Sequence, residues 1–295
     1  MATDGIPVRA ALAREWPVSD APENRRGELE ALTGRRQRRI SRFTQIALLG
    51  AVACVDEARA RPAPETGLYM VSSHGDVGDS ATMLETLYRG HQPPMPFDFI
   101  NVSSNMAGFY VARELGLDGP NMMLARGTDS LVAALELLGD DAAHAPFLVG
   151  AVEAASWPPE VHRRRLQVAA GTPLAEASCW LWLDPGCARP VGHLRWLRRV
   201  GSPEAALQAA AATGDGGRLL LTLGEQLAAA GAMAAIPDGW ARFAPEGPGY
   251  HEAGCARVLC RFLASGEPGT LLFLERHPLD RDYLAVCVTN RSSSA

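Results

Sequence analysis

The chain has 295 residues, of which 47% are hydrophobic, a formal net charge of -5 and a pI near 5.8. The negative charge argues against nucleic acid as the main partner, because a phosphate-binding surface normally carries an excess of Lys and Arg. No segment has the roughly 20 consecutive apolar residues that a bilayer crossing requires. Residues 1–17 show no signal-peptide pattern. We therefore expect a cytoplasmic protein that contacts neither nucleic acid nor membrane.

The elements predicted in the first part of the chain alternate between helix and strand. Apolar residues at helical spacing predict a helix with a basic start over 35–60, ended by Pro62, and a short apolar run predicts a buried strand over 67–73. A helix follows, capped by Asp79 or Ser80, then a short strand near 97–102 and a helix from about Ser104 to Leu117. Residues 121–126 predict a strand, 128–139 a helix and 145–153 a third buried strand. This alternation favours a mainly parallel sheet, with 67–73 and 122–126 as central strands.

The second part predicts a smaller α/β unit. Strands are expected over 179–185 and 218–224, an Ala-rich helix over 204–213 and a longer helix over 250–266. Residues 270–275 and 282–290 predict a closing pair of strands. Six cysteines lie mostly in apolar runs, and no two have C-x-x-C spacing. We expect reduced, buried thiols, no metal and no cofactor.

Several segments, taken together in order and spacing, resemble the β-ketoacyl-acyl-carrier-protein synthases. These are RRISRFTQIALLGAVACVDEA, PFDFINVSSNMAGFYVARELGLDGPN, LARGTDSLVAALELL, FLVGAVEAAS and HEAGCARVLCRFLASGEPG. The resemblance implies an α/β, thiolase-like, layered αβαβα fold with two related halves. It places an N-terminal half at 1–185 and a shortened C-terminal half at 186–295. The chain is similar to short members of the family, such as chain-length factors or synthase-like proteins of aryl-polyene pathways.

The resemblance also implies that the nucleophile is missing. Synthases carry a Cys in the turn between a strand and a helix, and a helix N-terminus activates the thiol. Matching the Ser-Leu-Val-Ala tract puts Gly127 at this position, and no Cys lies between Cys54 and Cys179. Thr128 or Ser130 could replace the thiol only with an adjacent general base. In the alternative interpretation, Thr128 and Asp129 merely cap the helix.

The histidines of the family are only partly matched. His251 matches the second active-site histidine, and it is either a functional group or a structural remnant. If His251 lies beside Arg126 and Gly127, its pKa should fall below the ordinary value, because a helix N-terminus and a guanidinium both disfavour the imidazolium. The first histidine has no match, and Asp215 and Glu225 are the only acid or base candidates in that region.

Arginines supply two further candidate binding sites. Arg126 beside the Gly127 turn could bind a carboxylate or a phosphopantetheine phosphate, or form an internal ion pair. Five arginines between Arg35 and Arg42 form either a solvated helix face or a docking patch for an acidic carrier protein. Residues 162–165, His-Arg-Arg-Arg, allow the same alternatives, and His74 is either a cleft residue or a solvated turn residue.

The leading functional hypothesis is a non-condensing, synthase-like subunit of fatty-acid or polyketide biosynthesis. Its partners would be acyl carrier protein and a second subunit, as a homodimer or a heterodimer with an active synthase. Arg126, Gly127 and Ser130 would line the substrate site. Small residues between Ser103 and Gly108 would pack across the dimer interface. The alternatives are an acyl-processing enzyme, hydrolytic or decarboxylating, that uses His251 and a hydroxyl such as that of Thr128, or a carrier-docking module.

Overall fold

The structure is a computed structural model that describes residues 5–127, 130–139, 141–213, 217–224, 227–228, 236–276 and 282–290. The described strands form one ten-stranded mixed sheet. Their bounds are β1 Ile6–Pro17, β2 Gly67–Ser72, β3 Asn121–Ala125, β4 Phe147–Glu153, β5 Ala175–Leu183, β6 Gly192–Val200, β7 Arg218–Leu223, β8 Trp240–Arg242, β9 Gly269–Arg276 and β10 Tyr283–Asn290.

The strand order shows that the chain contains the same arrangement twice. Along the sheet the order is β3-β2-β4-β5-β1-β6-β10-β9-β7-β8. The first set of five strands is β1 to β5 and the second is β6 to β10. If the strands of each set are numbered 1 to 5 along the chain, both sets have the order 3-2-4-5-1 from the outer edge of the sheet inward. The outer three strands of each set are parallel, and the two inner pairings are antiparallel. The two sets meet where Ile6–Val8 pairs with Gly192–Leu194.

The helices repeat in the same way. Their bounds are α1 Arg26–Thr33, α2 Arg42–Glu57, α3 Val77–Tyr88, α4 Pro96–Asn101, α5 Asn105–Leu115, α6 Ser130–Leu138, α7 Pro159–Leu166, α8 Pro203–Thr213 and α10 Gly254–Ser265. The first strand of each set is followed by an outer helix, α2 or α8, and the third by a central helix, α6 or α10. The expected two related halves are confirmed. The first is longer, because it carries α3, α4 and α5 between β2 and β3.

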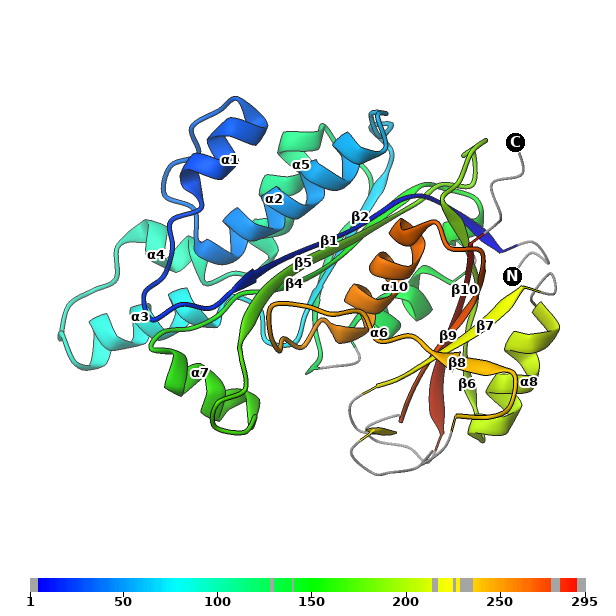
Figure 1. Cartoon of the computed structure of the whole chain (residues 1–295). Helices are drawn as coiled ribbons and strands as arrows, with labels where there is room; N and C mark the ends of the chain where they lie inside the picture. Colours follow the sequence, from blue (N-terminus) through cyan, green and yellow to red (C-terminus); the bar gives the residue numbers. More distant parts are fainter. Residues whose placement is uncertain are drawn as a thin grey trace.

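The layers are helix, sheet, helix, sheet, helix (Figure 1). α2 and α5 cover the outer face of the first set, α6 and α10 lie between the two sets, and α8 covers the second set. Three hydrophobic clusters fill the spaces between these layers, and the largest surrounds α6 and α10. α2 is apolar on nearly all sides because α1, α5 and the sheet enclose it. The predicted layered αβαβα, thiolase-like architecture is therefore confirmed. The domain division at residue 185 stays a prediction.

Several local predictions were wrong. The sheet is mixed, and β3 is its edge strand, with exposed or half-buried residues, whereas β2 is fully buried. The segment expected as a strand near 97–102 is α4, which Pro96 starts in the first helical position. The N-cap of α3 is Asp76, whose carboxylate accepts a hydrogen bond from the Asp79 N–H at 3.2 Å. β1 and β6 were not predicted. None of the helices in the described ranges has the length and apolar content that a bilayer crossing demands.

Candidate functional site

The turn between β3 and α6 carries Gly127, the residue that the resemblance predicts at the nucleophile position. The Gly127 backbone has φ +69°, a left-handed conformation that glycine adopts without the steric cost of a Cβ. Its N–H donates to the Ser73 carbonyl at 3.1 Å, and the Arg126 N–H donates to the Ser72 carbonyl at 3.3 Å. The turn is thereby fixed to the end of β2. The Arg126 side chain is exposed, and Thr128 lies outside the described residues.

Ser130 is buried, and its hydroxyl group holds this turn together through hydrogen bonds to the backbone. Its hydroxyl lies 2.7 Å from the Gly127 carbonyl and 3.0 Å from the Ser72 carbonyl, and it accepts a hydrogen bond from the Arg126 N–H at 3.0 Å. A hydroxyl becomes a nucleophile when a general base takes its proton, whereas the Ser130 proton faces backbone carbonyls. The geometry therefore gives Ser130 a structural role in the turn.

A buried carboxylic acid lies beside the turn, at the end of β4. Glu153 accepts hydrogen bonds from the Ser73 N–H at 2.6 Å and from the Ser72 hydroxyl at 3.1 Å. Burial, reinforced by the nearby carboxylate of Glu252, raises the pKa of Glu153 to about 8. Glu153 is consequently protonated at neutral pH. Glu252 also pairs with His74, with 3.2 Å between carboxylate oxygen and Nε2.

His251 lies in the central layer, just before α10, but its ring is directed to β1. Its Nε2 is 2.8 Å from the Glu15 carboxylate, and both side chains are about 1% exposed. Burial would raise the pKa of Glu15, but hydrogen bonds from His251 and Arg261 outweigh it, so the pKa of Glu15 is lowered. An ionised Glu15 can only accept, so the neutral His251 ring donates from Nε2. Its Nδ1 is buried and has no hydrogen-bond partner among the described residues.

The pKa of His251 is lowered, as predicted, but for a different reason. Desolvation is the main cause, and the charge of Arg257 adds to it, while Glu15 opposes the shift. The expected cause, a position beside Arg126, is not what lowers the pKa. The neighbouring residue Glu252 reaches towards the turn instead, through its ion pair with His74.

The sheet register places Glu15 and Glu153 in one row. Both residues are paired with Ala177 of β5, one from β1 and the other from β4. Residues paired across antiparallel strands point to the same face. The two carboxyl groups therefore lie on one face of the sheet, Glu153 neutral and Glu15 ionised, on either side of a small residue.

Comparison with known proteins rests on structure alone. No protein-family model matches the sequence, and no curated protein matches it. The solved structure of the ishigamide ketosynthase/chain length factor shares 17% identity over 89% of this chain and 85% of that chain, with a TM-score of 0.67. The type II polyketide synthase complex AntDE:AntF is a carrier protein in complex with its ketosynthase. It shares 12% identity over 98% of this chain and 100% of that chain, with a TM-score of 0.68. The chain has the thiolase-like fold of ketosynthases and chain length factors.

A further match is the ketosynthase ApeO in complex with its chain length factor ApeC from Xenorhabdus doucetiae. It shares 14% identity over 97% of this chain and 99% of that chain, with a TM-score of 0.54. At these identities the likeness concerns the fold. Within this thiolase-like fold the Gly127 turn and the His251 segment are equivalent positions, since each precedes a central helix.

The thiols of the chain lie in the core. All six cysteines are free and buried, as predicted. Burial raises the pKa of Cys54 and of Cys287 to about 12 and also raises the pKa of Cys179, Cys255 and Cys260. Since the thiolate is the nucleophile, these five are not activated thiols. Among the described residues no three His, Cys, Asp or Glu side chains gather to hold a metal ion.

Sequence reasoning missed the acidic residues of this site. Glu153 ends an otherwise apolar strand and Glu15 stands near the end of β1, and an acid inside an apolar run is a signal of a buried, partnered carboxyl group. The pairing of Glu15 with His251 spans 236 positions and has no local signature. Asp215 and Glu225, the other acid candidates, lie outside the described residues.

Proposed function

We propose that this protein is a non-condensing, ketosynthase-like subunit that pairs with an active ketosynthase in fatty-acid or polyketide biosynthesis. One observation carries the proposal: the turn that would hold the nucleophile contains Gly127, in a fold whose cysteines are all buried. Condensation needs an acyl-thioester intermediate on an accessible thiolate. A chain of this kind contributes to condensation only when a partner supplies the thiol.

An exposed apolar face supports pairing. Among the described residues, nine of the thirteen exposed large hydrophobic side chains lie between residues 84 and 122. We call these nine the apolar face: Leu84, Leu87, Tyr88, Met95, Phe97, Phe99, Ile100, Phe109 and Met122. They belong to α3, α4, α5, the edge strand β3 and the loop before α4. They are concentrated in one stretch of the chain, and exposed apolar side chains that gather together mark protein interaction surfaces. An open edge strand also favours association.

Of the small residues expected at the interface, Ser103 is exposed and Ser104 is half-buried, whereas the other two lie inside the subunit. Ala107 and Gly108 are buried, and a Cβ on Gly108 would meet the Asn121 side chain of β3. The Ser104 hydroxyl accepts a hydrogen bond from the Asp76 N–H at 3.0 Å. A large residue at Gly108 would therefore disturb the packing of α5 on β3, and the exposed ring of Phe109 is the better probe of association.

The matched structures favour a heterodimer with a ketosynthase over a homodimer. One of them is a ketosynthase in complex with its chain length factor, and another is a ketosynthase in complex with an acyl carrier protein. A homodimer of this chain would carry two Gly127 turns and no nucleophile. The proposal therefore gives this chain the role of a chain length factor, with acyl carrier protein as the donor of substrate. An aryl-polyene pathway is one setting that fits.

The alternative, an acyl-processing enzyme that uses a hydroxyl and a histidine, has less support. The Ser130 hydroxyl faces carbonyls. The buried Ser156 hydroxyl lies 3.3 Å from His162 Nδ1, but the same nitrogen lies 2.9 Å from an Arg165 guanidinium nitrogen. Burial and the charge of Arg165 lower the pKa of His162 to about 4. His162 is thus a weak base at neutral pH.

Co-expression with a Cys-containing ketosynthase tests the pairing. We expect a stable 1:1 complex in size-exclusion chromatography with light scattering. Phe99→Ser and Phe109→Ser, which remove rings that are 65% and 50% exposed, should weaken the complex at least about tenfold. Leu137→Ser is the matched control, because Leu137 is 55% exposed and lies outside the apolar face. Equal behaviour of all three variants would refute pairing through this face.

A further inference from the structure

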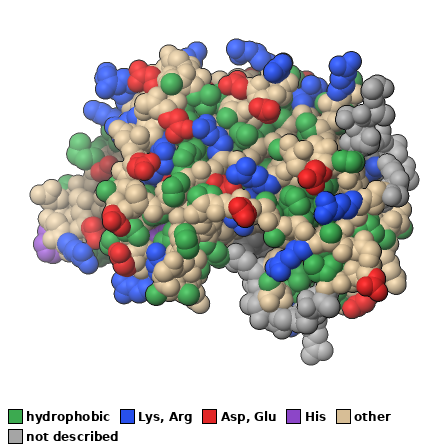
Figure 2. Space-filling view, viewed as in Figure 1, with side chains coloured by type: hydrophobic (Ala, Val, Ile, Leu, Met, Phe, Trp, Pro, Cys, Tyr) green, Lys and Arg blue, Asp and Glu red, His purple; other side chains and the backbone are tan. Residues whose placement is uncertain are grey.

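The carboxyl ends of the parallel strands β2, β3 and β4 meet at one edge of the sheet, beside the Gly127 turn. Open α/β sheets bind ligands outside this end of their strands. His74 follows β2 at this edge, and the residue before it, Ser73, accepts the hydrogen bond of the Gly127 N–H. In Figure 2, histidine side chains reach the surface at the left, over the end of the molecule that carries α3 and α7 in Figure 1. The fold therefore places a histidine next to the turn.

His74 and Glu252 form a partly exposed pair at this edge. The distance between His74 Nε2 and the Glu252 carboxylate is 3.2 Å, and the two side chains are 38% and 11% exposed. Because a carboxylate can only accept a hydrogen bond, Nε2 carries the hydrogen and Nδ1 keeps its lone pair. Within the described part of the chain, the Nδ1 atom makes no hydrogen bond. A carboxylate that orients a histidine in this way prepares the free ring nitrogen to act as a general base.

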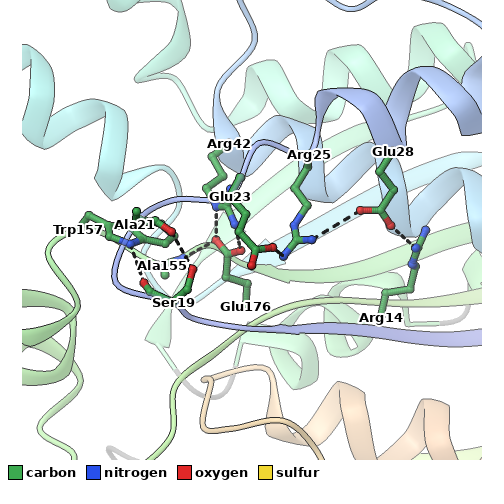
Figure 3. A network of polar contacts seen from close by, with 10 residues as sticks. All are labelled: Arg14, Ser19, Ala21, Glu23, Arg25, Glu28, Arg42, Ala155, Trp157 and Glu176. Atoms are coloured by element: carbon green, nitrogen blue, oxygen red, sulfur yellow. Dashed lines mark hydrogen bonds and ion pairs between the residues drawn. The ribbon is translucent and has the colours of Figure 1, made fainter.

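Two other acids close to this edge are not suited to act as the base. Figure 3 shows Glu176 of β5 held by the guanidinium of Arg42, and Glu176 also accepts a hydrogen bond from the Ala155 N–H at 3.1 Å. Glu153 keeps its proton at neutral pH, because burial and the charge of Glu252 raise its pKa to about 8. An acid that is paired with a guanidinium, or that is still protonated, does not take a proton from water.

A second histidine–carboxylate pair, His251 with Glu15, differs from the first in access. Both side chains of this pair are about 1% exposed, so a substrate cannot reach the ring. The side chain of His74, by contrast, is 38% exposed. The exposed pair is therefore the candidate for chemistry, whereas the buried pair joins β1 to the segment before α10.

We propose that the His74–Glu252 pair catalyses the hydrolysis of an acyl thioester by water. Because Gly127 has no side chain that could take up an acyl group, the base acts on water instead. Water adds to the thioester carbonyl while its proton passes to His74 Nδ1, and the N-terminus of α6 favours the negative charge that develops on the carbonyl oxygen. The intermediate then expels the thiolate, which takes the proton from His74, so that a carboxylic acid and a thiol are released. Glu252 is a positioning residue, which holds the ring and stabilises its protonated form.

Hydrolysis would be an activity in addition to the proposed function, and the choice of a thioester as substrate rests on that function. In a subunit that pairs with a ketosynthase, the acyl groups that reach the chain are thioesters of a carrier protein. Attack by water leaves no acyl group on the chain, which distinguishes this route from the alternative that uses a hydroxyl as nucleophile. The pair would release acyl groups that the ketosynthase does not extend.

Release of octanoic acid tests this activity. The substrates are octanoyl-loaded acyl carrier protein and the octanoyl thioester of N-acetylcysteamine, and mass spectrometry quantifies the acid. The chain is assayed alone and in complex with a ketosynthase whose nucleophilic Cys is replaced by Ala, so that the partner contributes no thiol. We expect the wild type to release octanoic acid faster than buffer does.

Variants of the pair assign the roles. His74→Gln should lower kcat/KM at least about 100-fold, and added imidazole should restore part of the activity of His74→Gly, because it replaces the missing base. Glu252→Gln should lower kcat/KM at least about tenfold, whereas Glu252→Asp, which keeps a carboxylate, should retain more activity than Glu252→Gln. His144→Gln is the matched control and should change kcat/KM less than about twofold, because His144 is exposed and precedes β4, at the opposite end of that strand.

Three results would overturn hydrolysis by this pair. These are equal kcat/KM values for His74→Gln and His144→Gln, release of octanoic acid no faster than in buffer in every sample, and a stoichiometric octanoyl adduct on the chain, which would show a nucleophilic side chain in place of water. Formation of the ketosynthase complex is scored separately by size-exclusion chromatography. Loss of hydrolysis with an intact complex would overturn only the activity, and hydrolysis of the small thioester without a complex would overturn only the pairing. Thermal unfolding of each variant checks that the fold is intact.

Discussion

Substituting Glu153 by Gln should change how stability depends on pH. The ordinary pKa of this carboxyl group is 4.5, and in the folded chain it is raised to about 8. The unfolded chain releases this proton near pH 4.5, whereas the folded chain holds it up to about pH 8. The resulting stabilisation is complete below pH 4.5 and is lost as the pH rises towards 8. The Glu153→Gln variant keeps the shape of the protonated acid but does not titrate.

The window between pH 6.5 and 8 isolates this effect. The pKa of Asp76 is raised to about 6, and that of His162 is lowered from 6.5 to about 4, so these groups titrate mainly below the window. What remains of their titration above pH 6.5 is common to the wild type and to Glu153→Gln and cancels in the difference. At 1.36 kcal/mol per pH unit, the free energy of unfolding of the wild type should fall by about 1.5 to 2 kcal/mol relative to Glu153→Gln across this window. Urea unfolding at pH 6.5 and at pH 8 measures this change in the free energy of unfolding. Glu160→Gln, at an exposed position, is the control and should follow the wild type. Identical pH slopes for wild type and Glu153→Gln would refute a buried, protonated Glu153.

Three further predictions concern stability. Because the pKa of His162 is lowered to about 4, the free energy of unfolding of the wild type should fall by about 3 kcal/mol relative to that of His162→Asn as the pH falls from 6.5 to 4. Identical acid unfolding curves for the two proteins would contradict this. Gly127→Ala should cost about 1 to 2 kcal/mol in thermal unfolding, since φ is +69°, and an unchanged midpoint would argue against the left-handed turn. Arg42→Met leaves the fully buried Glu176 carboxylate without its cation and should cost about 3 to 5 kcal/mol in urea unfolding, whereas a cost below about 1 kcal/mol would show that the ion pair is dispensable.

Elements with a local pattern are predictable from the sequence. Composition and periodicity alone predict the apolar helix α2 and the fully buried, mostly apolar strands β2 and β4. β1 is missed because its alternating burial places Arg9 and other polar residues between its buried ones. The prediction of a strand at α4 is wrong because its aromatic and β-branched residues favour extended structure, while Pro96 sets a helical start.

The sequence predicts those parts of the candidate site that lie within one local segment, but not those that depend on contacts between distant segments. The Gly127 turn lies within one continuous motif, so the sequence itself shows that no Cys stands between β3 and α6. The contacts of His251 depend on how β1 is placed beside β5 and how α10 packs on both, which no local pattern encodes. The neutral state of Glu153 likewise arises from the meeting of β2, β4 and Glu252.

Intact-mass spectrometry tests the absence of a nucleophile in this chain most directly. The purified chain is incubated with acyl- and malonyl-loaded carrier protein, alone and in complex with a Cys-containing ketosynthase, and each subunit is weighed. We predict that this chain keeps its unmodified mass in both samples, while the ketosynthase gains one acyl group on its cysteine. A stoichiometric acyl adduct on this chain, mapped by peptide analysis to Thr128 or Ser130, would contradict a non-condensing subunit and show an acyl-processing enzyme.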